Sequence, residues 1–509
     1  MSSKNNTIKI VTNAVTAKLI DADKKAMLEV NRCLTYMVDG YEQTTSYKLH
    51  KWDGTASFFN FSKATFPAGF FYFVAANLRQ AGYEVQLYKK ALPKPLGKMR
   101  PKIGNYEYDP RYEYQYTVTD KLLKHGQIIC RAATGSGKTN SAMIAFATIN
   151  RPTLFLTTRS ILMYQMKENV ENNLGIDVAV IGDGNFGFET ADGSKVLKRF
   201  TVATVQTIHS YLKEPTPMDS PLEVATQRKR QAFMKNILER FEFVILEEAH
   251  ESSASGWFEL LKNCTNAYYR LALTGTPFMK ESQEMNMRLM ASSGPVAITV
   301  TEKQLIDCGI LATPYFKFVH LQQKPKMLNP KTSWQPAYRI GIVENEERNQ
   351  AIIYEARRAI NHGLTVMILF KQIAHGKVLK QKLDALGISN ELLIGADDQA
   401  ERKRAINLLK EGKIKVLLGS TILDVGVDVP AVGMVILASA GKAEIALRQR
   451  IGRGLRAKKN QANICFVVDF DDPFNKYLKN HAQQRKAIIQ HTEGFKEHIV
   501  EDFDYSLLK

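Results

Sequence analysis

The sequence has few cysteines, no low-complexity tract and no apolar run of the roughly 18 to 20 residues that a membrane-spanning helix needs. No cysteines form a C-x-x-C pair, which argues against a zinc cluster or a disulfide framework and favours a reducing compartment. The polar start MSSKNNTIKI does not resemble a signal peptide. We therefore expect a cytoplasmic protein without a membrane partner. The five cysteines are Cys33, Cys130, Cys264, Cys308 and Cys465.

Acidic residues are in the minority. The 51 Asp and Glu face 69 Lys and Arg, which gives a formal net charge of +18. Such an excess is typical of proteins that bind a phosphate backbone, although a solvated basic surface would give the same count. The 45% hydrophobic content and the 509-residue length predict a folded chain of several domains, typical of a large enzyme.

Apolar runs of strand length alternate with helical patterns, which predicts an α/β fold with parallel sheets. The first series is QIICRA, PTLFLTT, FTVATVQ, FEFVILEE and YRLALTG. The second series is LTVMILFK, ELLIGA, IKVLLGST, GMVILASA and NICFVVDF. Two such series predict two α/β domains in tandem, preceded by a smaller α+β region.

These patterns predict six segments, with breaks where proline-rich or unpatterned stretches interrupt them. The segments are a small α+β domain at 1–91, a Tyr- and Pro-rich linker at 92–116, a first parallel-sheet domain at 117–310, an inter-domain connection at 311–345, a second parallel-sheet domain at 346–471 and a helical C-terminal extension at 472–509.

The stretch AATGSGKT follows a predicted strand and opens a predicted helix, which is the context of a phosphate-binding loop. Small residues let backbone N–H groups approach phosphates, and the helix N-terminus favours negative charge. Lys138 could reach the β and γ phosphates, and the Thr139 hydroxyl could hold Mg²⁺. A glycine turn entering an ordinary helix is the alternative, and the G-x-G-K-T pattern after a strand disfavours it. The predicted nucleotide contacts are Thr134, Gly135, Ser136, Gly137, Lys138 and Thr139.

A second candidate site is FVILEEAH, residues 243–250, where a buried-strand pattern runs into two carboxylates. The first acid, Glu247, would hold the metal, and Glu248 would orient or activate the attacking water. An acidic cap on the following helix is the alternative. Together with the phosphate loop, the pattern favours an ATP hydrolase that uses Mg²⁺.

The motif series then resembles the superfamily 2 helicases and translocases, in the right order from residue 112 to about residue 470. This resemblance implies two RecA-like motor domains with ATP in the cleft between them. It implies that Gln115 in YEYQY reads adenine, and that Thr274 and Thr276 of LTGTP couple hydrolysis to domain movement. His250 would link the acidic site to neighbouring elements. The resemblance also places Asp424, Gly426 and Asp428 near the nucleotide.

The same resemblance implies contacts with the nucleic-acid backbone. Those residues are Thr158 and Arg159 of TTRSILMYQ, Thr204 and Gln206 of ATVQTI, and Ser420 and Thr421 of GSTILDVGVDVP. In QRIGRGLR, the catalytic cations would be Arg453 and Arg456, which lie three residues apart and are therefore expected on one helical face. Planar cations of this kind stabilise the charge of the phosphoryl-transfer transition state.

The N-terminal pattern YEQTTSYKLHKWDGTASFFN is similar to that of the phage UvsW-type helicases, which implies a phage protein that remodels branched or forked DNA in recombination and repair. Basic residues interleaved with rings can contact phosphates and stack on bases. Lys48, Lys51 and Trp52 are the predicted DNA contacts, whereas Phe58 and Phe61 are expected in the core. The alternatives are a restriction-system motor subunit, an RNA helicase, and a nucleotide-gated DNA-binding protein in which Glu247 prevents hydrolysis.

Overall fold

The computed structural model describes residues 7–249, 254–278, 282–395, 397–420, 432–441, 444–458 and 462–508. The chain forms two compact units, which are described separately below. Unit 1 comprises Met1–Ala132 and Gly137–Thr299, and unit 2 comprises Ala133–Ser136 and Val300–Lys509. Among the described residues, no helix is both long and apolar enough to cross a bilayer.

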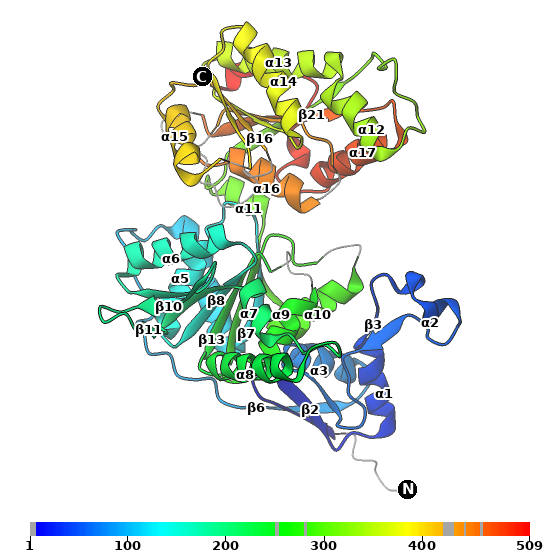
Figure 1. Ribbon diagram of the computed structural model, residues 1–509, viewed down its shortest axis with the longest axis vertical. Coiled ribbons are helices and arrows are strands. Elements are labelled where there is room, and N and C mark those ends of the chain that lie inside the picture. Colours follow the sequence, from blue (N-terminus) through cyan, green and yellow to red (C-terminus); the bar gives the residue numbers. More distant parts are fainter. Residues whose placement is uncertain are drawn as a thin grey trace. The chain divides into compact units, whose positions relative to one another are not determined.

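The N-terminal part of unit 1 is a four-stranded sheet in the order β5-β2-β1-β6, packed against two helices (Figure 1). Alternate residues of β1 and β2 are buried, so each strand presents one apolar face to these helices. The strands are β1 (Thr7–Thr12), β2 (Thr16–Ile20), β5 (Thr65–Pro67) and β6 (Glu84–Lys89), and the helices are α1 (Lys24–Cys33) and α3 (Phe71–Gln80). This small α+β region has the secondary structure that the sequence predicts.

The N-terminal region shares its hydrophobic core with the neighbouring parallel-sheet domain of unit 1. Phe258, Met287 and Ala291 from α9 (Ala254–Lys262) and α10 (Gln283–Ser293) pack into the same buried cluster as the N-terminal residues. A Cβ at Gly69 would collide with the backbone carbonyl of Met290, so this position has room only for glycine. The N-terminal region is therefore joined to the parallel-sheet domain by a common core.

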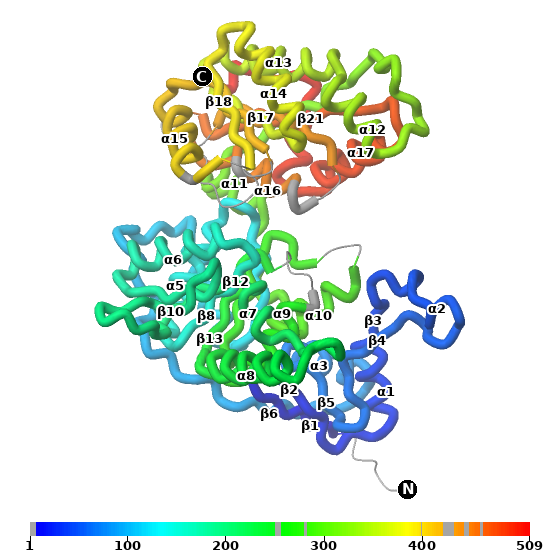
Figure 2. Tube along the Cα trace, in the orientation of Figure 1, coloured from blue at the N-terminus to red at the C-terminus, as the bar shows by residue number. Residues whose placement is uncertain are grey.

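An arm of about seventeen residues leaves this region between β3 (Thr35–Met37) and β4 (Thr55–Ser57), which form an antiparallel pair (Figure 2). The arm contains a 3₁₀ turn, η1 (Tyr41–Gln43), and a short helix, α2 (Thr45–Lys48). Thr44 caps α2 by accepting a hydrogen bond from the backbone of Tyr47.

The first parallel-sheet domain is built on a nine-stranded sheet in the order β11-β10-β9-β12-β8-β13-β14-β7-β15. The strands β9, β12, β8, β13, β14 and β7 pair in parallel, and β10 and β11 extend one edge as antiparallel strands. The strands are β7 (Gln127–Ala132), β8 (Thr153–Thr157), β9 (Val178–Gly182), β10 (Asn185–Glu189), β11 (Lys195–Val196), β12 (Phe200–Thr204), β13 (Phe243–Glu247), β14 (Tyr269–Thr274) and β15 (Val296–Val300). All five strands of the first predicted series are present, whereas β9, β10, β11 and β15 were not predicted.

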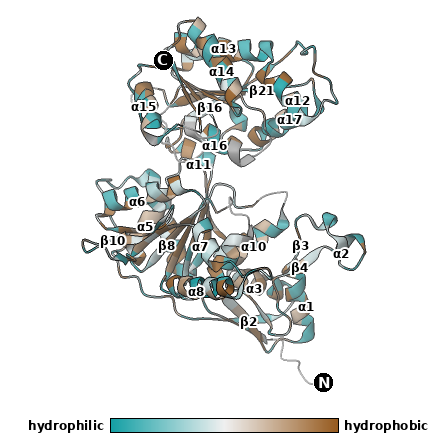
Figure 3. Ribbon diagram, in the orientation of Figure 1, coloured by the Kyte–Doolittle hydropathy of each residue, from teal (hydrophilic) through white to brown (hydrophobic). Residues whose placement is uncertain are grey.

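Helices cover both faces of this sheet (Figure 1). One face packs against α7 (Val205–Leu212), α8 (Pro221–Leu238) and α9. The other packs against α4 (Glu113–His125), α5 (Lys138–Ile149) and α6 (Ser160–Leu174). The strands are accordingly the apolar interior, brown in Figure 3, between helices with polar outer faces.

Unit 2 contains a seven-stranded sheet in the order β18-β19-β17-β20-β21-β16-β22, and its six strand pairs are parallel. The strands are β16 (Thr313–His320), β17 (Val366–Leu369), β18 (Asn390–Leu393), β19 (Val416–Gly419), β20 (Met434–Leu437), β21 (Ile464–Asp471) and β22 (Ile499–Val500). The helices are α11 (Glu302–Asp307), α12 (Trp334–Tyr338), a π-helix η4 (Arg339–Val343), α13 (Glu346–Asn361), α14 (Ile373–Ala385), α15 (Gln399–Lys410), α16 (Glu444–Gly454) and α17 (Lys476–Gln490). All five strands of the second predicted series are present.

Two predicted segments differ from the structure of unit 2. Residues 311–345 were expected to be an inter-domain connection, but β16 lies within the sheet because it pairs along its whole length with β21. The extension 472–509 was expected to be helical, but after α17 it adds the short strand β22 beside β16. Phe503 and Tyr505 then pack into the core of unit 2. Neither pairing can be seen in a local pattern, because the partners are far apart in sequence.

Candidate functional site

Three adjacent strands of unit 1, in the order β13-β14-β7, end at the same edge of the sheet. The loop of AATGSGKT follows β7, Glu247 and Glu248 lie at the end of β13, and Thr274 ends β14. The carboxyl ends of parallel strands are where open α/β sheets bind their ligands. The predicted phosphate loop and the predicted acidic site therefore lie side by side.

The phosphate loop enters α5 through two glycines in the left-handed region, Gly135 at φ +88° and Gly137 at φ +77°. Gly137 precedes α5, which begins at Lys138 and continues with Thr139. A Cβ at Gly137 would lie 2.5 Å from Nε2 of Gln115, a residue of α4 that is buried. Hence Gln115 packs directly against the loop, even though 22 positions separate it from Gly137 in the sequence.

The remaining loop residues also have the conformation of a tight turn. The amide of Ser136 donates to the carbonyl of Ala133 at 3.1 Å, and the Ser136 side chain is buried. Thr134 is half-buried beside it in the sequence. These turns direct successive backbone amides into the start of α5, the arrangement that receives a phosphate group.

Lys138 and Glu248 form an ion pair with 3.8 Å between Nζ and Oε1, and both side chains are largely inaccessible. Glu248 has a φ of +47°, which is unusual for a residue with a side chain. Strain of this kind is found at functional sites, where the surrounding structure maintains it. This conformation turns the chain sharply after β13.

Glu247 is the half-buried last residue of β13, and its Oε2 atom is buried. Burial, together with the negative charge of Glu248, raises the pKa of Glu247 to about 8, and Lys138 partly opposes this rise. Within the described part of the chain, no group hydrogen-bonds Oε2 of Glu247. A carboxylate in such surroundings is stabilised in its charged form by a nearby cation.

These side chains fit a Mg²⁺ ion that is bound together with nucleotide. Mg²⁺ is normally held by one or two carboxylates, a hydroxyl or water ligands, and phosphate oxygens. Glu247 and the Thr139 hydroxyl are the candidate protein ligands, and they follow the ends of strands β13 and β7. The ion would supply charge neutralisation at the phosphates.

At the end of β14, the Thr274 hydroxyl accepts a hydrogen bond from the amide of Thr276 at 3.2 Å. Thr274 is fully buried. Because β14 lies between β13 and β7, this turn lies between the two glutamates and the phosphate loop. His250 lies outside the described residues.

The predicted nucleic-acid residues of unit 1 lie after β8 and β12, which are parallel neighbours. Gln206 Nε2 donates to the carbonyl of Thr158 at 2.9 Å, so the two motifs touch. The Thr204 and Thr207 hydroxyls share a hydrogen bond of 2.8 Å. Arg159 and Gln206 are exposed, whereas Thr204 is buried and supports the turn.

In unit 2, Ser420 follows β19 and is buried, with its amide donating to Leu393. The structure does not describe Thr421, Asp424, Gly426 or Asp428, nor the side chain of Arg453, so their predicted roles lie outside the described residues.

The expectation for the two arginines was wrong in one respect. Arg453 lies in α16, but this helix ends at Gly454. Arg456 instead pairs with Leu311 in an antiparallel β-bridge, and the amide of Ala312 donates to the carbonyl of Leu455 at 2.7 Å. These backbone pairings replace the next helical turn, so Arg453 and Arg456 do not share a helical face. Arg456 is exposed.

The arm of unit 1 carries the remaining candidates. Lys48 and Lys51 are exposed, and Trp52 is half-buried with Nε1 donating to the carbonyl of Thr55 at 2.7 Å. The indole is therefore anchored at its polar end. Phe58 packs against the N-terminal core as expected, but Phe61 is exposed, because it lies in the turn between β4 and β5.

Comparisons with known proteins agree with this geometry. The family model "Type III restriction enzyme, res subunit" matches residues 108–279, and the model "Helicase conserved C-terminal domain" matches residues 336–458. The ATP-dependent DNA helicase uvsW of Enterobacteria phage T4 is 20% identical over 473 residues, which cover 89% of this chain and 88% of that protein.

Other relatives cover less of their own length. The DNA 3'-5' translocase XPB2 of Sulfurisphaera tokodaii is 22% identical, covering 70% of this chain and 81% of that protein. A protein named as helicase 22 of Sulfolobus islandicus filamentous virus is 24% identical, and this chain spans 49% of its length. Among solved structures, the DUF1998 helicase MrfA bound to DNA has a TM-score of 0.53 at 14% identity, covering 78% of this chain and 55% of that one. The likeness to MrfA shows that the fold is shared.

The two helicase-type domain matches, in order along the chain, fall within the two parallel-sheet domains and their flanks, and the match to uvsW covers 89% of the chain. The chain therefore belongs to the superfamily 2 helicases, the class of ATP-dependent nucleic-acid motors built on tandem RecA-like domains, and is similar to the UvsW type.

Proposed function

We propose that this protein is a DNA motor that uses ATP and Mg²⁺ to remodel branched or forked DNA in recombination and repair. The observation that carries the proposal is the site in unit 1 where Lys138, the first residue of α5 after the phosphate loop, pairs with Glu248 at the end of β13. The similarity to uvsW along 89% of the chain supports DNA as the substrate class.

In the proposed reaction, the loop amides and Lys138 bind the phosphates, and Gln115 contributes to adenine recognition. Glu247 and Thr139 hold the metal. Glu248 orients the attacking water, and its ion pair with Lys138 keeps its carboxylate close to the phosphate end of the site.

The cations of unit 2 would complete the chemistry. Arg453 and Arg456 would stabilise the charge that develops on the transferred phosphoryl group, while Gly426 and Asp428 would contact the nucleotide. Because Arg456 lies beyond α16, the two arginines would approach from different backbone segments. The protein would bind the DNA backbone differently before and after ATP hydrolysis. A cycle of binding and hydrolysis would therefore move it stepwise along a strand.

DNA would contact three regions. Thr158, Arg159, Thr204 and Gln206 would hold the backbone on unit 1, with Ser420 and Thr421 doing the same on unit 2. The arm would contribute Lys48 and Lys51 to phosphates and the Trp52 ring to an exposed base. Sequence preference is not expected, because these contacts go mainly to the backbone.

The decisive test is phosphate release from ATP and Mg²⁺ without nucleic acid and with linear duplex, single-stranded DNA, a four-way DNA junction or duplex RNA. We expect DNA to stimulate turnover, with the junction most effective, and Lys138→Ala to abolish it. Greatest stimulation by RNA would favour an RNA helicase, and equal stimulation by linear duplex and junction would favour a restriction-type motor. Binding of ATP and DNA without phosphate release would refute the motor proposal.

A further inference from the structure

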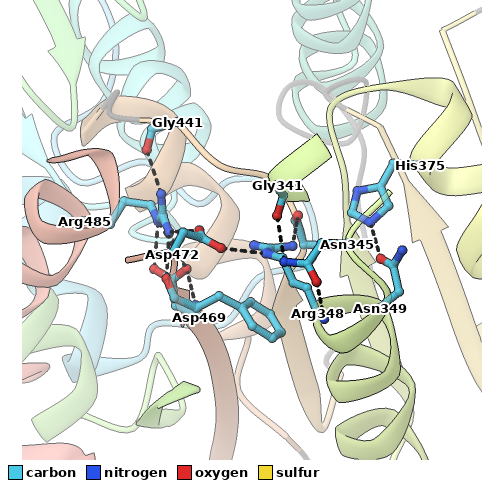
Figure 4. Close-up of polar contacts among 11 residues, drawn as sticks. Gly341, Asn345, Arg348, Asn349, His375, Gly441, Asp469, Asp472 and Arg485 are labelled. Atoms are coloured by element: carbon cyan, nitrogen blue, oxygen red, sulfur yellow. Dashed lines mark hydrogen bonds and ion pairs between the residues drawn. The ribbon is translucent and has the colours of Figure 1, made fainter. Parts of the chain in front are cut away.

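Unit 2 contains a buried polar network at the end of β21 (Figure 4). The network contains Arg348 of α13 and Arg485 of α17, and both arginines are at most 3% exposed. Their acidic partners, Asp469 and Asp472, are equally inaccessible. The other members are Asn345, Asn349 and His375.

Arg348 of α13 contacts the residues that directly follow β21 and β20. Its Nε donates to Asp472 Oδ1 at 3.1 Å, and its Nη1 donates to the carbonyl of Ala438 at 2.6 Å. The guanidinium also lies over the ring of Phe470, 4.3 Å from the centroid. A planar cation that makes all three contacts has little freedom to rotate.

Arg485 makes a similar set of contacts from α17. Its Nε and Nη2 each lie 2.9 Å from an oxygen of Asp469, in a two-pronged ion pair. Its Nη1 donates to the carbonyl of Gly441 at 3.2 Å. Hence each arginine donates one hydrogen bond to a backbone carbonyl of the same short segment, residues 438–441.

This segment directly follows β20 and precedes α16, the helix that contains Arg453. It is held at further points. The amide of Ser439 donates to the carbonyl of Leu369 at 3.0 Å, and Arg450 of α16 donates to the Ser439 hydroxyl at 2.8 Å. The segment is thus tied to α13, to α17, to the sheet and to α16 itself.

Stability alone is a weak reason for such a network. Burying ion pairs costs desolvation energy, and replacing a buried pair by well-packed apolar side chains is often neutral or stabilising. What apolar side chains cannot reproduce is directional bonding to the carbonyls of Ala438 and Gly441. The contacts therefore fix the position of residues 438–441, which the Arg450–Ser439 hydrogen bond joins to α16.

We propose that Arg348 and Arg485 are positioning residues that fix residues 438–441 and thereby orient α16, with Arg453, for ATP hydrolysis. The inference rests on the proposed function, because it assigns a role within that reaction. Neither residue touches the nucleotide in this scheme. Their effect is on the turnover number and not on the affinity for ATP.

The test compares the wild type with a double variant, Arg348→Met with Asp472→Leu, which removes both charges of one pair. It also removes the longer contact of 3.8 Å between Asp472 and Arg485, but it keeps the Arg485–Asp469 pair. We expect the ATPase kcat at saturating DNA to fall by about 10- to 100-fold, the size of effect that small misplacements of a catalytic group produce. The Kd of a fluorescent ATP analogue and the KM for ATP should stay within about twofold.

A matched control is Lys317→Met with Glu355→Leu. Lys317 Nζ and Glu355 Oε1 lie 2.7 Å apart, and Glu355 is a buried residue of the same helix, α13. In the described part of unit 2, this pair makes no hydrogen bond to residues 438–441. We expect its kcat to remain within about twofold of the wild type.

If the Arg348/Asp472 variant does not fold, Arg485→Lys serves as the second test, since lysine keeps the charge beside Asp469 but lacks the fork that reaches Gly441. An unchanged kcat in either folded variant would overturn the inference, as would an equal fall in the control. A wild type that releases no phosphate would instead refute the proposed function itself.

Discussion

Glu248 has an unusual backbone conformation with a positive φ, and its carboxylate pairs with Lys138. Both features restrict the orientation of its side chain. If it orients the attacking water, Glu248→Gln should lower the ATPase kcat by about 10² to 10⁴, the range for a lost general base. Binding of ATP should change little, because the phosphate loop and Lys138 remain. Phosphate release and the Kd of a fluorescent analogue would measure the two effects. A variant that keeps its turnover would exclude this role.

The helicase motif that EEAH resembles begins with an aspartate, where this chain has Glu247. The glutamate carboxylate extends roughly one carbon–carbon bond further, its Oε2 is buried, and burial together with the charge of Glu248 raises its pKa to about 8. The structure therefore presents a carboxylate that would need a cation in order to be charged near neutral pH. This property is compatible with metal binding and gives no support to a hydrolysis-deficient switch.

Gly137 is a second residue whose backbone determines the site. Gly137→Ala should weaken ATP binding by about tenfold or more, because the new Cβ meets Gln115 Nε2 and the φ of +77° disfavours a side chain. Gly363→Ala is the matched control, since Gly363 has a φ of +78° but no atom within 4 Å of the added Cβ. Titration with a fluorescent analogue would compare the variants. Equal affinities would show that Gln115 does not restrict the loop.

At the level of elements, the helices α13 and α14 are joined by a buried histidine. His375 Nε2 lies 2.8 Å from Asn349 Oδ1, and burial together with the charge of Arg348 lowers the pKa of His375 to about 3. The folded protein therefore holds this ring neutral where an unfolded chain would protonate it near pH 6.5. Its contribution to stability is present above pH 6.5 and is lost as the pH falls toward 3.

His375→Gln removes this titration while keeping a polar partner for Asn349. The free energy of unfolding of the wild type should thus fall more steeply than that of the variant between pH 6.5 and pH 4, by a difference on the order of a few kcal/mol. Urea unfolding at several pH values would measure both curves. Parallel curves would indicate that the ring is solvated and protonated in the native state.

On the scale of the whole molecule, the arm between β3 and β4 can be tested by removal, which also deletes the hydrogen bonds of Asp39 with Ser282 and Glu284. Val38 and Gly54 are already joined by a backbone hydrogen bond of 2.9 Å, so a two-residue Asn-Gly turn could replace the arm between them. We expect thermal stability and DNA-free ATPase to be kept, while affinity for a junction falls and depends less on salt, because the phosphate contacts of Lys48 and Lys51 are lost.

Fluorescence anisotropy with a labelled junction at two salt concentrations would measure this change, and Lys48→Ala with Lys51→Ala is the finer comparison. Unchanged affinity and salt dependence would place the DNA contacts elsewhere. Removal of residues 1–91 is not an equivalent experiment. It would expose Phe258, Met287 and Ala291, which the N-terminal region covers, and should destabilise unit 1.

The sequence by itself determined the parallel-sheet class, ten strands and the motif order, because strand periodicity and loop-to-helix signals such as AATGSGKT are local. It also placed the phosphate loop after one predicted strand and the paired glutamates at the end of another, and the sheet order β13-β14-β7 brings these two strand ends to one edge.

Only the tertiary structure decided what depends on partners distant in sequence. The pairing of β16 with β21 moved residues 313–320 into the second sheet, and the bridge between Leu311 and Arg456 ended α16 early. Contact between Gln115 and Gly137, and the convergence of Arg348 and Arg485 on residues 438–441, likewise arise from packing. No periodicity encodes these contacts, because each is fixed by burial and hydrogen bonding among elements that fold together.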